Sequence, residues 1–426
     1  MKSLAVQFRS FNGCARLLMV QQFTINTAFY MLMPYLAVHL AAGLGMAAWA
    51  VGLVLGVRNF TQQGMFLVGG TLADRLGYKP VIVVGCVLRT VGFGLLGFVS
   101  SLPALVVASA ATGFAGALFN PAVRAYLAQE AGERRVEAFA AFNVFYQAGM
   151  FVGPLVGLVL LAADFRLICS VAAVLFLALT VIQLRMLPVR KETPSDESTG
   201  VLADWRTVIA NRPFLLFALA MIGSYVLSFQ VYLALPLQAH RAAPDRGDAV
   251  TTALFTVSAA VAVAGQLKIT AWARARWSSQ RAIVYGIALM GAAFLPLLID
   301  AGPTTRGTGP LAWTAALSPL FAAVALLALG TAMVYPFEMD TVVSLAGGRL
   351  VATHYGLYNT VAGLGITLGN LTTGAVWDAA DRLGHPELTW WVLAATGAFC
   401  AGSVGLLARS GRLTARPEPE LAAAAS

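Results

Sequence analysis

The sequence predicts an all-α membrane protein with twelve transmembrane helices in two six-helix bundles. Of its 426 residues, 59% are apolar and only 11% are charged, whereas about a quarter of a soluble domain is charged. Twelve apolar runs have the length of about 20 residues that a helix needs to cross a bilayer. These runs are too long for barrel strands, and backbone groups in lipid otherwise bond within their own helix. The short segments between them leave no room for a soluble enzyme domain or a DNA-binding regulator.

The expected spans fall into two sets of six, separated by a polar segment rich in Pro and Ser. Residues 1–187 form the expected N-terminal bundle, 188–212 a cytoplasmic linker, 213–410 the C-terminal bundle, and 411–426 a disordered cytoplasmic tail. The expected spans are 17–40, 47–73, 80–100, 103–127, 137–162, 165–187, 213–238, 250–272, 282–300, 311–336, 350–377 and 389–408.

A faint repeat relates the two sets of spans. Phe142-Asn143 recurs as Tyr358-Asn359, and Pro121 recurs as Pro336. Two related bundles that rock about a shared midplane site are typical of secondary transporters.

The Lys and Arg residues predict the orientation in the membrane. With the N-terminus inside, 21 of the 28 basic residues lie on the cytoplasmic side, as the positive-inside rule requires. We therefore expect a multi-pass protein of the plasma membrane with both termini in the cytoplasm. The net charge of +9 then reflects topology, and no nucleic-acid partner is expected. The four Cys and four His residues show no ligand spacing, so we expect no metal and no cofactor.

A motif for gating stands between the second and third spans. Residues 69–80 resemble the G-x-L-A-D-R-x-G-R-K signature of the major facilitator superfamily, with Tyr78 in place of the usual Arg. Asp74 would cap the positive N-terminal end of the eleventh span, near Leu350. The alternative is a plain positively charged turn. The residues assigned to the gating motif are Gly70, Asp74, Arg75, Gly77 and Lys79.

The fifth span carries a second motif. Gly149, Gly153, Pro154 and Gly157 resemble the G-x-x-x-G-P-x-x-G-G motif of the drug-exporting antiporter branch of that superfamily, with only the last Gly replaced. Small residues four apart allow close helix packing, and ordinary packing is the alternative reading.

A closer resemblance is to the MdtH-type multidrug exporters. It implies the major facilitator fold and proton-driven export of drugs or metabolites. In the fourth span the chain departs from the superfamily pattern, because it has Ser109 and Thr112 where many exporters carry an arginine. The residues that carry the resemblance are 51–64, Lys79-Pro80, Arg89 and 164–167.

Two arginines, Arg58 and Arg89, fall near the middle of expected spans, where an ionisable residue by default marks a substrate or ion path. No Asp or Glu falls in the middle of a span, so we expect neutral or anionic amphipathic substrates. A purely structural role is the alternative, and it is favoured for Arg89. For the uncharged members of the cavity, polar bonds between helices are the alternative. The expected substrate cavity comprises Gln22, Asn26, Tyr30, Arg58, Gln62, Asn143, Tyr146, Tyr225 and Asn359.

The candidates for proton coupling are Asp74, Glu338, Asp340 and His354, although each could instead be a surface charge. The preferred function is proton-coupled export by alternating access, by a chain that is not an enzyme and acts as a monomer. Two alternatives remain: an uptake symporter or facilitator for an organic anion, and a non-transporting membrane sensor or scaffold.

Overall fold

The computed structural model describes residues 4–188, 200–298 and 310–413, and every regular element within these ranges is a helix. The prediction of an all-helical membrane protein is thus confirmed for the described residues. The expected tail lies outside them from residue 414 onward, as does the part of the linker from 189 to 199.

The first half of the chain contains helices that correspond to the first six expected spans, preceded by the short helix α1. α2 begins after Asn12, whose side chain accepts a hydrogen bond from the backbone nitrogen of Ala15 (2.8 Å), as expected of a helix N-cap. The elements are α1 (Leu4–Arg9), α2 (Gly13–Val38), η1 (His39–Gly43), α3 (Ala48–Gly64), α4 (Phe66–Leu76), α5 (Tyr78–Phe98), α6 (Leu102–Ala131), η2 (Gly132–Arg134), α7 (Arg135–Leu161) and α8 (Phe165–Met186).

The second half follows the linker, part of which is itself a helix. The elements are α9 (Val201–Ala210), α10 (Arg212–Ala220), α11 (Ile222–Phe229), η3 (Gln230–Tyr232), α12 (Ala234–Ala242), η4 (Pro244–Arg246), α13 (Gly247–Arg276), α14 (Ser279–Ala292), η5 (Leu295–Leu298), α15 (Pro310–Ala346), α16 (Val351–Leu383) and α17 (Leu388–Arg409).

Among the described residues, eight helical stretches are long and apolar enough to cross a membrane by length and composition. One of them, Leu102–Leu161, covers two expected spans, because α6 and α7 are joined by a single 3-10 turn. The expected spans that correspond to α2, α3–α4 and α16 are not among the eight. The chain is therefore a multi-pass membrane protein, and the number twelve stays a prediction.

Three expected spans differ in detail from the helices. The second is interrupted at Met65, between α3 and α4, and the seventh is divided into α10, α11 and α12. Pro236 explains the last break, because it cannot donate a hydrogen bond to the carbonyl one turn earlier. The expected end of the tenth span at Pro336 is wrong, since α15 continues to Ala346 with this proline inside it.

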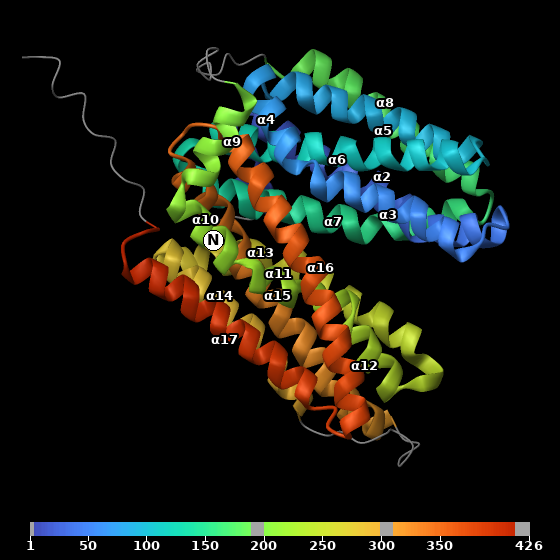
Figure 1. Ribbon diagram of the computed structural model, residues 1–426, viewed down its shortest axis with the longest axis vertical. Helices are drawn as coiled ribbons and strands as arrows, with labels where there is room; N and C mark the ends of the chain where they lie inside the picture. Colours follow the sequence, from blue (N-terminus) through green and yellow to red (C-terminus); the bar gives the residue numbers. More distant parts are fainter. Residues whose placement is uncertain (1–3, 189–199, 299–309, 414–426) are drawn as a thin grey trace, which may run out of the picture.

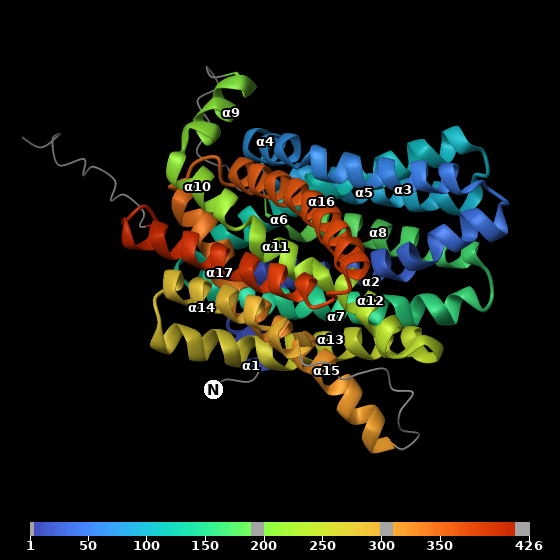
Figure 2. The ribbon, with the colours of Figure 1, turned by 60° about the horizontal axis from the view of Figure 1, so that its bottom comes forward.

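The two halves meet at one end of the molecule and diverge toward the other (Figure 1). At the end where they meet, α16 of the second half lies against α4 and α6 of the first. The N-terminus, α9 and the end of α17 lie toward the same side of the view, and the turned view shows α9 projecting beyond α4 and α10 (Figure 2). We call this end, which carries Asp74, Glu137, Asp340 and α9, the linker end.

Candidate functional site

Asp74 joins the two halves at the linker end. Its carboxylate accepts hydrogen bonds from the backbone nitrogens of Ala352 (3.0 Å) and Thr353 (2.7 Å), and from the Thr353 hydroxyl (2.6 Å). These nitrogens belong to the first turn of α16, whose own N-cap residue, Leu350, provides no side-chain cap. Since the first nitrogens of a helix lack partners and carry positive charge, Asp74 caps this helix from the other half of the chain.

Gly70 lets α4 and α16 approach closely enough for that contact. A Cβ atom at Gly70 would lie 2.1 Å from the carbonyl oxygen of Ala352, and one at Gly356 would lie 2.4 Å from that of Phe66. Any side chain at these two positions would push the helices apart. The contact thus depends on small residues in both halves.

Gly77 and Lys79 shape the turn that follows Asp74. Gly77 has a φ of 88°, a conformation that favours glycine, and it connects α4 to α5. Lys79 donates to the carbonyls of Leu184 (2.9 Å) and Leu187 (2.7 Å), so it neutralises the end of α8 rather than pairing with an acid.

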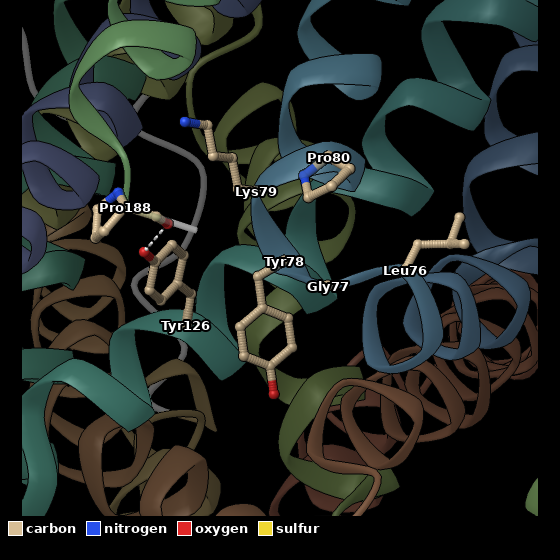
Figure 3. A pocket seen from close by; sticks show the side chains of 7 residues that line it. All are labelled: Leu76, Gly77, Tyr78, Lys79, Pro80, Tyr126 and Pro188. Atoms are coloured by element: carbon tan, nitrogen blue, oxygen red, sulfur yellow. Dashed lines mark hydrogen bonds between the residues drawn. The ribbon is translucent and has the colours of Figure 1, made fainter. Parts of the chain in front are cut away.

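A pocket at this turn has a volume of about 40 Å³, far below the several hundred Å³ of a drug-sized site. The hydroxyl of Tyr126 donates to the carbonyl of Pro188 across it (2.8 Å) (Figure 3). The pocket is therefore not a candidate substrate site. Its lining residues are Leu76, Gly77, Tyr78, Lys79, Pro80, Tyr126 and Pro188.

The linker helix α9 is attached to the gating motif. Arg75 forms an ion pair with Asp204 at 2.7 Å, and the indole nitrogen of Trp205 donates to the Thr71 hydroxyl (2.8 Å). Asp204 is only 4% exposed, so the carboxylate of this ion pair is buried. The linker therefore packs against the same helix that carries Asp74.

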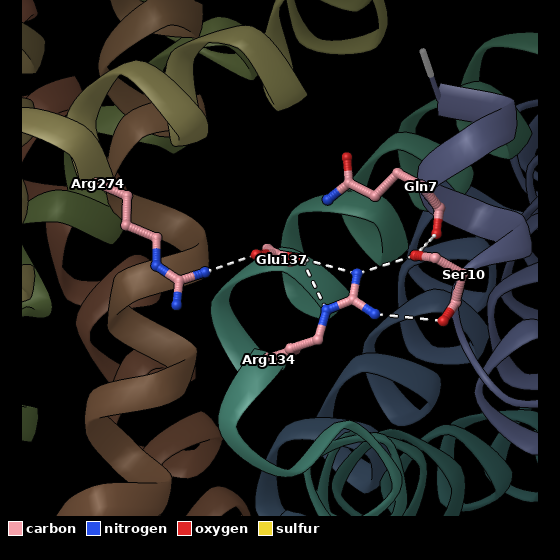
Figure 4. A network of polar contacts seen from close by, with 5 residues as sticks. All are labelled: Gln7, Ser10, Arg134, Glu137 and Arg274. Atoms are coloured by element: carbon pink, nitrogen blue, oxygen red, sulfur yellow. Dashed lines mark hydrogen bonds and ion pairs between the residues drawn. The ribbon is translucent and has the colours of Figure 1, made fainter. Parts of the chain in front are cut away.

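A second polar network joins the halves at the linker end (Figure 4). Glu137, in the first turn of α7, pairs with Arg274 of α13 at 2.8 Å and with Arg134 at 2.8 Å. Arg134 also donates to the Ser10 hydroxyl (2.9 Å). These side chains are partly exposed, so each pair contributes little alone, but together they add to the contacts between the two halves at the linker end.

Glu338, a candidate for proton coupling, is buried, so the alternative that it is a surface charge at the end of a span is wrong. It is 4% exposed because α15 continues past it, and it accepts hydrogen bonds from the hydroxyls of Tyr225 and Tyr358. Arg124 of α6 interacts electrostatically with it, and Arg124 donates to the side-chain oxygen of Asn359 (3.1 Å). Adjacent residues of α16 thus link a carboxylate of the second half to an arginine of the first.

The other two proton-coupling candidates are also held by partners. Asp340 forms an ion pair with Arg135 of the first half at 2.8 Å. His354 is 3% exposed, with one ring nitrogen 2.8 Å from the Leu350 carbonyl and the other 3.2 Å from the Asn211 amide. His354 is therefore not a surface charge, whereas Asp340 is partly exposed.

The residues of the antiporter motif pack α7 against α2 within the first half. A Cβ at the third glycine, Gly157, would lie 2.1 Å from the Met31 carbonyl oxygen. The carbonyl of Pro154 accepts a hydrogen bond from the Tyr35 hydroxyl (2.8 Å). Close approach to α2 is also made by Gly149 and Gly153.

Several residues expected in the substrate cavity instead bond helices to one another. Gln22 and Asn26 are buried; Gln22 donates to Asn26 (3.2 Å), which donates to the carbonyl of Tyr146 (2.9 Å). Asn143 donates to Gln266 across the two halves (2.7 Å). Tyr225 and Asn359 belong to the Glu338 network rather than to one site with the others.

Arg58, the charged member of the expected cavity, is half-buried. It donates to Gln62, one turn away (2.8 Å), and to Asn59 (2.8 Å), and its guanidinium lies 4.5 Å from the centre of the Phe29 ring. Tyr30 lies near Arg58 and Tyr146 of the first half and Tyr232 of the second.

Sequence reasoning missed Arg124, Asp204, Gln266 and Tyr358. The repeat indicated one of them, Arg124. This residue follows Pro121 by three positions, and Glu338 follows the related Pro336 by two. The two related prolines thus place opposite charges at similar depth in the two halves.

Comparison with known sequences decides the family. Residues 18–370 match the Major Facilitator Superfamily. The chain belongs to this superfamily. It is 55% identical over 390 residues to an uncharacterized MFS-type transporter of Mycobacterium tuberculosis, with 92% of each chain covered.

Two more distant relatives of this chain are multidrug resistance proteins named MdtH. The protein from Klebsiella pneumoniae is 29% identical over 385 residues, covering 89% of this chain and 90% of the relative. The one from Salmonella arizonae is 27% identical over 381 residues, with the same coverage. The resemblance to MdtH-type proteins is confirmed, and this superfamily member is a transporter rather than an enzyme.

Proposed function

We propose that the protein is a secondary active transporter that exports small amphipathic drugs or metabolites by proton antiport. It would act as a monomer in the plasma membrane, with twelve spans in two bundles and both termini in the cytoplasm. The linker end would then face the cytoplasm, and the structure would correspond to a state closed on that side.

The Asp74 contact is the observation that carries this proposal. A carboxylate that caps a helix of the other half makes a bond that can be broken without unfolding either half. The neighbouring pairs, Arg135–Asp340 and Glu137–Arg274, also join side chains from both halves. An interface of separable polar contacts supports alternating access, in which the same surfaces part and meet again.

Glu338 is the best-supported residue for proton coupling. It is a buried carboxylate held by two tyrosine hydroxyls, and it is linked through α16 to Arg124 of the other half. A change in its charge would therefore alter contacts within and between the halves. The tyrosines can donate to the charged carboxylate, and on its protonation their hydroxyls can accept.

Glu338→Gln separates coupling from binding. Glutamine retains the acceptor oxygen but cannot take up a proton, so we expect efflux driven by a pH gradient in proteoliposomes to fall at least about tenfold. Exchange of labelled for unlabelled substrate, which needs no net proton movement, should continue. Unchanged pH-driven efflux would remove Glu338 from the coupling path.

Direction is tested in cells that lack their own efflux pumps. Accumulation of anionic, neutral and cationic fluorescent compounds is compared with and without the chain, and with a protonophore. Reduced accumulation that the protonophore abolishes supports energised export. Increased accumulation favours uptake, and unchanged accumulation of every compound favours a sensor or scaffold.

A further inference from the structure

We propose that Arg58 and Arg89 together form an anion-binding site that holds the acidic group of an organic anion with an aromatic or apolar body. This inference rests on the transport function proposed above and names its substrate class. It also gives Arg89 a role in binding, in contrast to the structural role that the sequence favoured.

The two arginines lie against one aromatic ring. Arg58 extends from α3 and Arg89 from α5, and their guanidinium carbons lie 4.5 Å and 5.8 Å from the centre of the Phe29 ring. Arg89 is only 5% exposed. Its guanidinium carbon is also 5.7 Å and 5.4 Å from the rings of Phe119 and Phe176. Aromatic faces attract the cations, but they cannot neutralise two positive charges.

Both side chains retain hydrogen-bond donors that nothing satisfies. Nε of Arg58, and Nε and Nη1 of Arg89, are buried without a hydrogen-bond partner. The titratable groups near the two guanidinium groups are Tyr30, Tyr146 and Cys86, together with each other, and no described carboxylate is among them. Buried charges in proteins are normally paired and fully hydrogen-bonded. The missing partner is therefore an anion with several acceptor oxygens.

Gly116 lies between Arg89 and Gln62, the residue that accepts a hydrogen bond from Arg58. A Cβ at Gly116 would lie 3.0 Å from the side-chain amide carbon of Gln62 and 3.3 Å from Nη2 of Arg89. Gln62 is also the residue to which Arg58 donates. The absence of a side chain at this position thus lets Arg89 approach Gln62, and Gln62 in turn orients Arg58.

The surroundings specify the rest of the ligand. Arg58 is half-buried, so it is the accessible member, and Arg89 lies deeper. Tyr30 and Tyr146 of the first half lie near Arg58, and Tyr232 of the second half lies near Tyr30. These side chains offer aromatic surface with hydroxyl groups, which suits a flat apolar body. Arg124, by contrast, is bonded to Asn359 and lies near Glu338, so it needs no added anion.

Three pyrene derivatives of the same shape test the site. Purified full-length protein in lipid nanodiscs is titrated with 1-pyrenesulfonate, 1-pyrenemethanol and 1-pyrenemethylammonium, and fluorescence is corrected with empty nanodiscs. We expect the sulfonate to bind at least about tenfold more tightly than the alcohol, and the ammonium compound to bind most weakly. Equal binding of the three probes, or a preference for the ammonium compound, would overturn the proposal.

Arg58→Gln is the decisive variant, because Arg58 is not deeply buried. It should weaken sulfonate binding at least about tenfold while changing alcohol binding less than about twofold. Arg58→Lys, which keeps the charge, should retain part of the sulfonate preference, and the exposed control Arg281→Gln should change nothing. If Arg58→Gln weakened all three probes equally, the side chain would shape the cavity without binding an anion.

Arg89 is tested with a second pair of variants, since removal of a buried arginine can prevent folding. Arg89→Gln should reduce the sulfonate preference, and Arg89→Lys should restore part of it in protein whose thermal unfolding is cooperative. A sulfonate preference that survives in folded Arg89→Gln would exclude this residue. These titrations measure binding alone. They therefore test the anion site independently of the direction and energy source of transport.

Discussion

Replacing Asp74 with alanine removes the cap that the first half provides to α16. Three hydrogen bonds are lost, but the cost of burying the carboxylate is removed as well. A net loss equal to one hydrogen bond to a charged group, about 1.5–3 kcal/mol, would shift the balance from the closed toward the open linker end by about 10- to 160-fold.

Distances between spin labels measure this shift. Labels are placed at Glu133→Cys and Arg276→Cys, which are exposed positions at the linker end of the first and second halves. The native cysteines Cys14, Cys86, Cys169 and Cys400 are first replaced. Pulsed electron paramagnetic resonance should then show a longer distance in Asp74→Ala that is rare or absent in the parent protein.

Asp378→Asn is the matched control, because Asp378 is an exposed carboxylate on α16, the helix that Asp74 caps, and lies far from the N-terminus of that helix. It should leave the distance distribution unchanged. If Asp74→Ala gave the parent distribution, or if both variants changed it equally, the Asp74 contact would not hold the linker end closed.

Two further predictions concern packing and the linker. Gly157→Ala forces a methyl group against the Met31 carbonyl and should lower the stability of the first half by about 1–3 kcal/mol, measured as a lower thermal unfolding midpoint. Gly374→Ala, where no atom lies within 4 Å of the added carbon, should not lower it, and equal effects would contradict the packing argument. Trp205→Phe removes the bond to Thr71, worth about 1 kcal/mol, and should speed amide hydrogen exchange in α9 about fivefold; unchanged exchange would show that α9 is held by other contacts.

The Asp74 contact could be anticipated because residues 69–80 resemble a known signature and because the N-terminal end of a helix attracts a carboxylate. Glu338 was misplaced for a local reason. Pro336 suggested the end of a span, but a membrane helix tolerates a proline where neighbouring helices satisfy the freed carbonyl.

The sequence alone could not decide the role of the amide side chains in the expected cavity. Gln22 and Asn26 are four residues apart on one helical face, a spacing that suits a substrate site and an interhelical bond equally well. Only the position of α7 decides between them. Asp204 was missed because its partner, Arg75, is distant in sequence and the pairing exists only once the linker folds as a helix.

The double attachment of the linker has a mechanical consequence. α9 is bonded to α4 through Asp204 and Trp205, and directly after it the side chain of Asn211 donates to the carbonyl of Leu345 in α15 (2.9 Å). The intervening residues are helical, and a helix stretches far less readily than a coil. This segment therefore ties the two halves together at the linker end. They can separate there only after the contacts of α9 with α4 or the bond from Asn211 to Leu345 has broken.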